Sequence, residues 1–221
     1  MENVKLVNVT VDGVKHTYPY GTPYGVIAAD FQKNYAHDIL LVNREGKLLE
    51  LHKTLDRDCI LKMVTAEEKP GMQTYERSAV FLMLKALYDV AGRECVERVE
   101  YSVSHALFIR TKGGFMLDEA FLKRVEARMR EIAAQALPIE KKSVNTDDAV
   151  ELFQRTQMHD KARLLSYRIN SHVNIYTLDG FSDYFYGYMV PNTGYLKCFG
   201  LELFEDGFVL RLPAQKDPDQ L

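Results

Sequence analysis

The sequence predicts an α+β protein built from two domains, and three observations support this prediction. Residues 4–11 alternate apolar and polar side chains with a period of two and then reach an Asp-Gly pair, which is typical of a β-hairpin. Residues 74–92 and 118–137 instead repeat apolar side chains at helical spacing. The polar stretch 67–73 lies between the hairpin region and the first of these helices. The expected division is a small domain over residues 1–66, a linker over 67–73, a larger domain over 74–213 and a tail over 214–221.

Residues 1–66 are expected to fold as strand, strand, helix and three further strands. Val14–Tyr18 provides the return strand of the hairpin. Thr22-Pro23 favours a helix start, with Thr22 as the cap and Pro23 in the first helical position. The residues predicted to form the apolar face of this helix are Val26, Ile27, Ala29 and Phe31. The later strands are predicted over 38–43, 48–51 and 59–65. This order of elements is typical of a small β-grasp (ubiquitin-like) domain.

Residues 74–213 are expected to combine helices with short strands. Thr74 is the predicted cap of a helix that ends at Gly92, and Pro138 ends a helix that begins at Asp118. The predicted buried side of the second helix consists of Phe121, Val125, Met129 and Ile132. Strands are predicted over 99–103, 106–111, 139–144, 174–178, 195–203 and 208–212, and short helices over 149–153 and near 161–165.

The composition favours a protein of the reducing cytoplasm. The 221 residues carry a formal net charge of −3, so contact with RNA would need a local basic patch. The three cysteines, Cys59, Cys95 and Cys198, are far apart and form no Cys-x-x-Cys pair, which argues against a disulfide framework or a zinc ribbon. No apolar run reaches the roughly 18 residues of a membrane span, so we expect no membrane partner.

The most distinctive stretch is Phe181–Phe199, which combines aromatic side chains with a Val-Pro-Asn turn. It resembles the metal-binding loop in the second additional domain, the editing domain, of threonyl- and alanyl-tRNA synthetases. The positions that match the frame of that loop are Asp183, Gly187, Val190, Pro191 and Gly194. The resemblance extends over about residues 72–212, and the first 65 residues resemble the TGS domain at the start of threonyl-tRNA synthetases. It therefore implies a TGS-like β-grasp domain followed by an α+β domain of the editing type.

The metal ligands of that family do not occur at the matching positions. In the synthetases, two histidines one helical turn apart and a cysteine and histidine from the loop can reach one metal ion. The resemblance places Glu76 and Val80 at the helix positions, and Phe185 and Met189 at the loop positions. Valine and phenylalanine cannot bind a metal, and Met189 offers only a thioether. The prediction is therefore that this chain has no metal site.

The loop and the last strand also resemble a second family. In bacterial nucleoside kinase-like (uridine kinase-like) proteins, a synthetase-like half is fused to a phosphoribulokinase/uridine kinase domain, and Val190–Lys197 and Leu210–Pro213 match that half. This resemblance implies a covalently linked kinase domain that uses ATP and magnesium, with the tail 214–221 leading to it. The kinase is not within these residues, because Gly46-Lys47 has leucines where a P-loop needs glycine and Ser/Thr. We expect no cofactor within this chain.

The candidate ligand-binding residues are Asp183, Tyr184, Tyr186 and Tyr188, whose rings could stack on a base or nucleoside. The alternative is that the aromatic residues fill the space left by the missing metal ligands. No residues stand out as catalytic, and only Glu76, His105 and Asp183 are candidates for activating water. His105 could equally be a structural histidine, and Asp183 could equally cap the turn that follows it.

Three functions are compatible with these features. The first is a non-catalytic regulatory or ligand-binding module of a nucleoside kinase-like protein. The second is a metal-independent aminoacyl-tRNA deacylase, and the third is a stand-alone tRNA-binding module. For the third, Lys141-Lys142 and the arginines of the 118–137 helix could contact an RNA backbone, although acidic side chains are interleaved with them. The sequence leaves open whether the chain is an enzyme.

Overall fold

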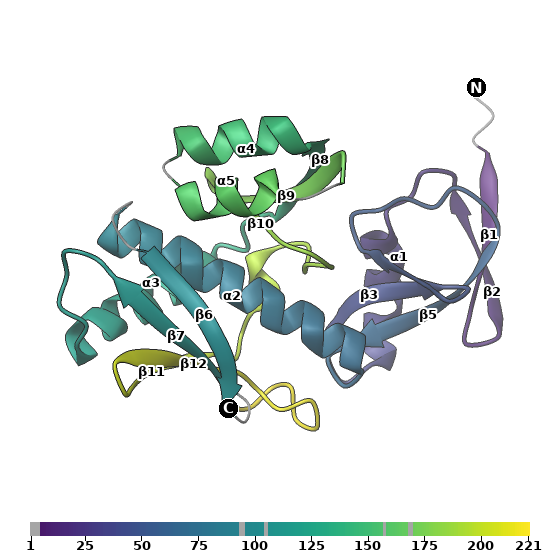
Figure 1. Ribbon diagram of the computed structural model, residues 1–221. Coiled ribbons are helices and arrows are strands. Elements are labelled where there is room, and N and C mark those ends of the chain that lie inside the picture. The colour runs from purple at the N-terminus through teal and green to yellow at the C-terminus, as the bar shows by residue number, and fades with distance from the viewer. Residues whose placement is uncertain (1–4, 93–95, 104–105, 157, 168–169) are drawn as a thin grey trace.

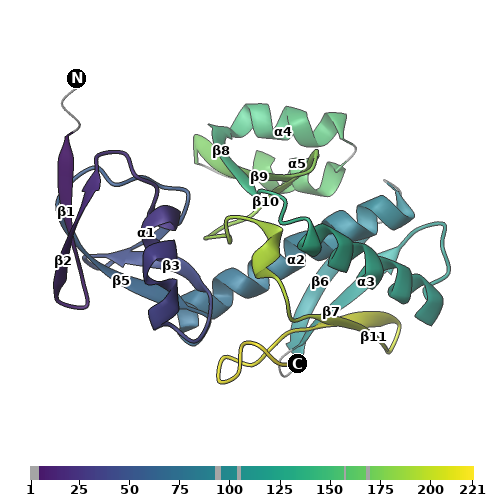
Figure 2. The ribbon, with the colours of Figure 1, turned by 180° about the vertical axis from the view of Figure 1, so that it is seen from behind.

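The computed structural model describes residues 5–92, 96–103, 106–156, 158–167 and 170–221 (Figure 1). Within these ranges the strands form a five-stranded, a four-stranded and a three-stranded sheet. The long helix α2 (Lys69–Ala91) extends from the five-stranded sheet and passes alongside the other two (Figures 1 and 2). The protein is therefore mixed α and β, as predicted.

The five-stranded sheet belongs to the first domain and has the order β2-β1-β5-β3-β4. Its strands are β1 (Leu6–Val11), β2 (Val14–Pro19), β3 (Ile39–Arg44), β4 (Lys47–Glu50) and β5 (Cys59–Thr65). β1 and β5 are parallel, and the other neighbours are antiparallel. The predicted hairpin is confirmed, with Asp12 and Gly13 at φ +50° and +79° in its turn, because two left-handed residues match the twist of the paired strands.

Helix α1 (Tyr24–Phe31) packs on this sheet, and the short 3-10 helix η1 (Gln32–Asn34) follows it. The predicted cap is wrong, since Pro23 occupies the cap position and the Thr22 hydroxyl donates to the Pro19 carbonyl at 2.8 Å. The buried residues are Tyr24, Ile27, Ala28 and Phe31, whereas the predicted Val26 and Ala29 face outward. Tyr24 can be buried in this helix because its hydroxyl accepts a hydrogen bond from Arg44 at 2.9 Å.

The predicted linker is largely helical. Helix α2 begins at Lys69, so only residues 66–68 separate it from β5. Pro70 lies in its first turn, where a missing N–H costs nothing, and Thr74 lies one turn further on. The prediction that Thr74 caps the helix is therefore wrong: its buried hydroxyl donates to the Pro70 carbonyl at 2.8 Å. Helix α2 thus connects the five-stranded sheet to the rest of the chain.

The four-stranded sheet has the order β11-β12-β7-β6 and is antiparallel. Its strands are β6 (Val96–Val103), β7 (Ala106–Lys112), β11 (Gly200–Phe204) and β12 (Gly207–Arg211). Helices α2 and α3 (Glu119–Ala134) share a hydrophobic core with this sheet. The predicted buried side of α3 is confirmed, and Asp118 caps the helix by accepting from the N–H of Phe121 at 2.7 Å.

The three-stranded sheet has the order β10-β9-β8 and is covered by two short helices. Its elements are β8 (Glu140–Asn145), α4 (Thr146–Arg155), α5 (His159–Ser166), β9 (His172–Leu178) and β10 (Phe181–Tyr184). Strand β10 was not predicted. The strand predicted over 195–203 begins only at Gly200, because Asn192 caps the 3-10 helix η2 (Thr193–Tyr195) by accepting from the N–H of Gly194.

No helix in the described part of the chain is both long enough and apolar enough to cross a membrane. The domains meet along α2 and the segment 185–199, and their cores are in contact there. Leu40 of β3 belongs to the core of the second domain, and Tyr195 packs against both cores. The relative position of the two domains is therefore defined by side-chain packing as well as by the helix.

We predict that Gly71→Ala lowers the free energy of unfolding by about 1–3 kcal/mol, the usual cost of overpacking. A Cβ at this position would lie 1.9 Å from the carbonyl oxygen of Thr65, so β5 and α2 would have to move apart. Urea denaturation measures the change. Gln73→Ala, at an exposed position of the same helix, is the control and should leave stability unchanged. Equal stability of the two variants would show that the close junction does not form.

Candidate functional site

The loop over residues 185–192, between β10 and η2, lies against α2 and is anchored to it. Arg77 donates from Nη1 to the carbonyl of Tyr188 at 2.8 Å, and Ser78 Oγ accepts from the N–H of Val190 at 3.0 Å. Gly187 has φ +116°, and a Cβ there would lie 2.6 Å from Cζ of Arg77. Only glycine therefore allows the loop to approach the guanidinium this closely.

The positions that the synthetase resemblance assigns to metal ligands lie where this loop meets α2. Val80 and Met189 are 9% and 2% exposed and belong to the core of the second domain. Phe185 packs against the same core, whereas Glu76 is partly exposed. Among the described residues, no group of three or more His, Cys, Asp or Glu side chains could hold a metal ion. Three of the four side chains thus provide apolar packing between helix and loop.

A carboxylate of the first domain lies at the centre of this junction. Glu50, the last residue of β4, is only 3% exposed. Its Oε1 accepts from the N–H of Met189 at 3.0 Å and lies 2.8 Å from the hydroxyl of Tyr176. Its Oε2 forms an ion pair with Nζ of Lys141 at 2.7 Å. Strands β8 and β9 and the loop 185–192 therefore converge on one side chain from the other domain.

Burial of this junction shifts the ionisation of the side chains around Glu50. Burial raises the pKa of Tyr176, and the charge of Glu50 adds to the increase, so the phenol keeps its proton for hydrogen bonding. Burial lowers the pKa of Arg77. Burial also lowers the pKa of His52, where the charges of two lysines act in the same direction and Glu50 opposes them. Neutral His52 therefore leaves Lys141 as the cationic partner of Glu50.

The structure separates the four predicted ligand-binding residues. Asp183 is 2% exposed, forms an ion pair with Lys161 and accepts from the N–H of Tyr184 at 2.6 Å. Burial raises the pKa of Asp183, and Lys161 opposes this effect. The ring of Tyr184 packs against the core formed by α4, α5 and β9. Asp183 is therefore buried, and Tyr184 is partly buried against this core.

The other two predicted residues lie nearer the surface of the loop. Tyr186 is 82% exposed, and Tyr188 is partly buried with Nζ of Lys141 6.0 Å from its ring centre. Of the predicted catalytic candidates, Glu76 is partly exposed on α2, and His105 lies outside the described residues. The geometry thus presents an exposed aromatic side chain at the tip of an anchored loop.

Sequence reasoning missed the two residues that organise this site. Glu50 ends a short polar strand, and its sequence gives no sign that it is buried against another domain. Arg77 resembles an exposed helix residue, but it sits beneath Gly187. The one available signal was Gly187 itself, because a glycine inside an aromatic segment suggests a close backbone approach.

Comparison with known proteins relates this chain to threonine–tRNA ligases. It is 25% identical to the enzyme of Porphyromonas gingivalis over 196 residues, which cover 86% of this chain and 29% of the relative. It is 27% identical to that of Syntrophotalea carbinolica over 199 residues, covering 86% and 30%. For Polaromonas sp. the identity is 26% over 206 residues, covering 89% and 31%.

The chain spans about three-tenths of the length of these relatives, so the similarity concerns one part of the ligase. No protein-family model matches the chain. The comparisons support a relationship of this chain to part of the threonine–tRNA ligases, and they give no support to a nucleoside kinase parent.

We predict that Glu50→Gln destabilises the protein by about 3–5 kcal/mol, the typical cost of breaking a buried ion pair by removing one partner. Glutamine keeps an oxygen for Met189 and Tyr176 but leaves Lys141 unpaired. Glu45→Gln, at a more exposed site with its own surface ion pair to Arg57, is the matched control and should cost less than about 1 kcal/mol. Urea denaturation followed by tyrosine fluorescence compares them. Equal effects would show that Glu50 does not hold the domains together.

Proposed function

We propose that this chain is a non-hydrolysing tRNA-binding module of threonyl-tRNA synthetase type. The observation that carries this proposal is the packing of the loop 185–192. At the positions of the synthetase metal ligands, Val80, Phe185 and Met189 supply hydrophobic contacts, while Tyr186 of the same loop remains exposed. The loop thus keeps a surface for recognition but lacks the side chains that would activate water through a metal.

The architecture supports a tRNA-binding origin for both domains. The first sheet, with its central parallel pair β1 and β5 and one packed helix, is what a TGS-like β-grasp domain requires. The second domain carries the loop that resembles the editing loop. Sequence similarity to threonine–tRNA ligases covers 86–89% of this chain and therefore includes both domains. We infer that the pair retains the part of such a ligase that faces tRNA.

Local charge at the domain junction favours contact with RNA despite the acidic chain. Three cations lie near two carboxylates here: Lys53, Arg77 and Lys141 near Glu50 and Glu76. Burial is the largest cause of the lowered pKa of His52 and of Arg77, and these charges modify both shifts. Arg77 and Lys141 therefore place cations beside the loop, although the whole chain has a net charge of −3. An exposed tyrosine is a suitable platform for an unpaired base, which can stack on the ring while the phosphates meet nearby cations.

The deacylase alternative finds less support in the geometry. A water-activating carboxylate has to reach solvent, but Asp183 is buried and paired with Lys161. Glu76 is partly exposed, and it has interacting neighbours of its own, including Arg77. We therefore place binding ahead of hydrolysis. Because the relatives named above are ligases, we also leave a linked kinase domain, ATP and magnesium out of the proposed function.

We predict that Tyr186→Ala weakens binding of an unacylated threonine tRNA transcript at least about fivefold, since stacking of one base contributes about 1–3 kcal/mol. Fluorescence anisotropy at several salt concentrations measures the dissociation constant. Wild-type affinity should fall steeply as salt rises, because cations at the junction replace counterions of the RNA.

Tyr20→Ala is the matched control for this experiment. Tyr20 is 53% exposed and has Nζ of Lys5 4.7 Å from its ring centre, so it also combines an exposed aromatic ring with a lysine. It follows β2, the edge strand far from the second domain in Figure 1. Its substitution should leave tRNA affinity unchanged. Undetectable binding by the wild type at low salt, or equal losses in both variants, would contradict the proposed function.

A further inference from the structure

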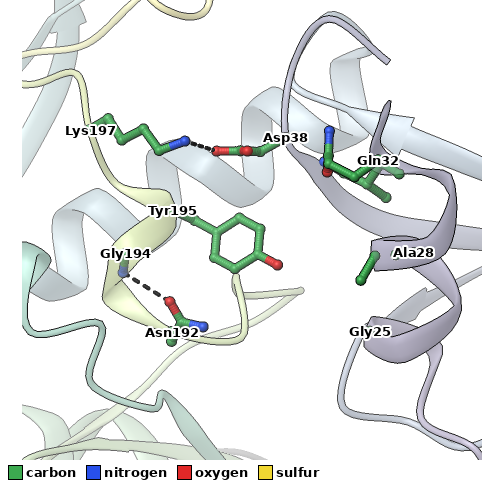
Figure 3. A pocket seen from close by; sticks show the side chains of 10 residues that line it. Gly25, Ala28, Gln32, Asp38, Asn192, Gly194, Tyr195 and Lys197 are labelled. Atoms are coloured by element: carbon green, nitrogen blue, oxygen red, sulfur yellow. Dashed lines mark hydrogen bonds and ion pairs between the residues drawn. The ribbon is translucent and has the colours of Figure 1, made fainter. Parts of the chain in front are cut away.

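A cleft of about 490 Å³ lies between the domains (Figure 3). One wall is formed by α1 and the start of β3, and the other by residues 192–197 of the second domain. Its size falls in the range of sites that bind small molecules, roughly 300–1,000 Å³. Its lining includes Gly25, Ala28, Ala29, Asn192, Tyr195 and Lys197.

The two walls differ in a way that suits a flat ligand. Tyr195 projects across the cleft towards Ala28, as Figure 3 shows. The opposing helix presents only small side chains at Gly25, Ala28 and Ala29. Because these side chains are small, there is room for a planar group to lie against the ring of Tyr195.

Two polar groups in the cleft are available for hydrogen bonding. The hydroxyl of Tyr195 and the side-chain N–H₂ of Asn192 have no hydrogen-bond partner within the described part of the chain, whereas Asn192 Oδ1 accepts from the N–H of Gly194 at 2.9 Å. Burial raises the pKa of Tyr195, and the charge of Asp38 adds to the increase, so its hydroxyl stays protonated. The cleft thus offers donors and an acceptor to the edge of a polar ring.

The charges of the cleft argue against an anionic ligand. Lys197, its one lining cation, forms an ion pair with Asp38 at 2.5 Å, so the wall is neutral overall. The N-terminus of α1 could otherwise attract a phosphate. Its first N–H groups are already taken, since Tyr24 and Gly25 donate to the carbonyls of Lys53 and Leu51 at 2.8 Å each.

We propose that this cleft binds a neutral heteroaromatic ligand of the nucleoside class, with its base against Tyr195 and its polar edge at Asn192. Tyr195 packs against the hydrophobic cores of both domains, so the ligand would contact a residue that already joins them. Binding would therefore stabilise the observed arrangement of the domains. This site uses Asn192, Tyr195 and α1 and does not include Tyr186, where the tRNA surface is proposed.

Isothermal titration calorimetry of the whole chain with adenosine, guanosine, cytidine and uridine, and with their 5′-triphosphates, tests the proposal. We expect at least one nucleoside to bind, and its triphosphate to bind at least about tenfold more weakly because Lys197, the cation that lines the cleft, is paired with Asp38. Tyr195→Phe removes only the hydroxyl and should weaken binding about fivefold. Asn192→Asp keeps the acceptor for Gly194 but removes the donor, and should weaken binding by a similar factor.

A variant that blocks the cleft, with a control variant on the same helix, tests where the nucleoside binds. Ala29→Phe fills the cleft from an exposed position of α1 and should weaken nucleoside binding more than tenfold. Val26→Phe changes an exposed residue of the same helix that does not line the cleft, and should bind as the wild type does. The proposal is overturned if no nucleoside binds at millimolar concentration, if Ala29→Phe binds normally, or if a triphosphate binds more tightly. A loss in Tyr186→Ala would instead locate the nucleoside at the loop and also overturn it.

Discussion

The buried carboxylate of Glu50 is the constraint on which the junction of the two domains depends. An ionised group that is 3% exposed is tolerated only when its lone pairs are satisfied, and the hydrogen bonds to Glu50 come from Tyr176, Met189 and Lys141 of the other domain. If the first domain separated from the second, the charge of Glu50 would therefore be exposed to solvent or left buried without a partner. Because one of the partners is the N–H of Met189, the same interaction also fixes the loop 185–192.

This constraint explains how the loop keeps its shape with apolar residues in place of metal ligands. In the synthetases that the loop resembles, a metal ion would tie loop and helix together. Here Ser78 and Arg77 bind the backbone of the loop from α2, and Glu50 binds it from the first domain. Met189 and Phe185 then pack into the core. Metal-binding side chains at these positions would instead leave polar atoms that need hydrogen-bond partners. A recognition surface can therefore persist after the chemistry of the site has changed.

Much of the fold could be predicted because local patterns were unambiguous. The hairpin at Asp12-Gly13 and the buried side of α3 follow from turn chemistry and helical spacing alone. The start of α2 could not be predicted in this way, since Pro70-Gly71 is equally typical of a turn and of a first helical turn, and tertiary packing against Thr65 decides between them. For the site, the resemblance identified the loop, but the burial of Glu50 and Asp183 depends on contacts between segments that are distant in sequence.

We propose that the chain binds tRNA without hydrolysing an aminoacyl ester. The most direct test mixes the protein with a radiolabelled, aminoacylated threonine tRNA at low salt and follows both complex formation and the ester in the same sample. We expect a salt-sensitive complex in which the ester decays only at its rate in buffer. Hydrolysis faster than in buffer that is lost in Glu76→Gln would contradict it, and so would the absence of any complex.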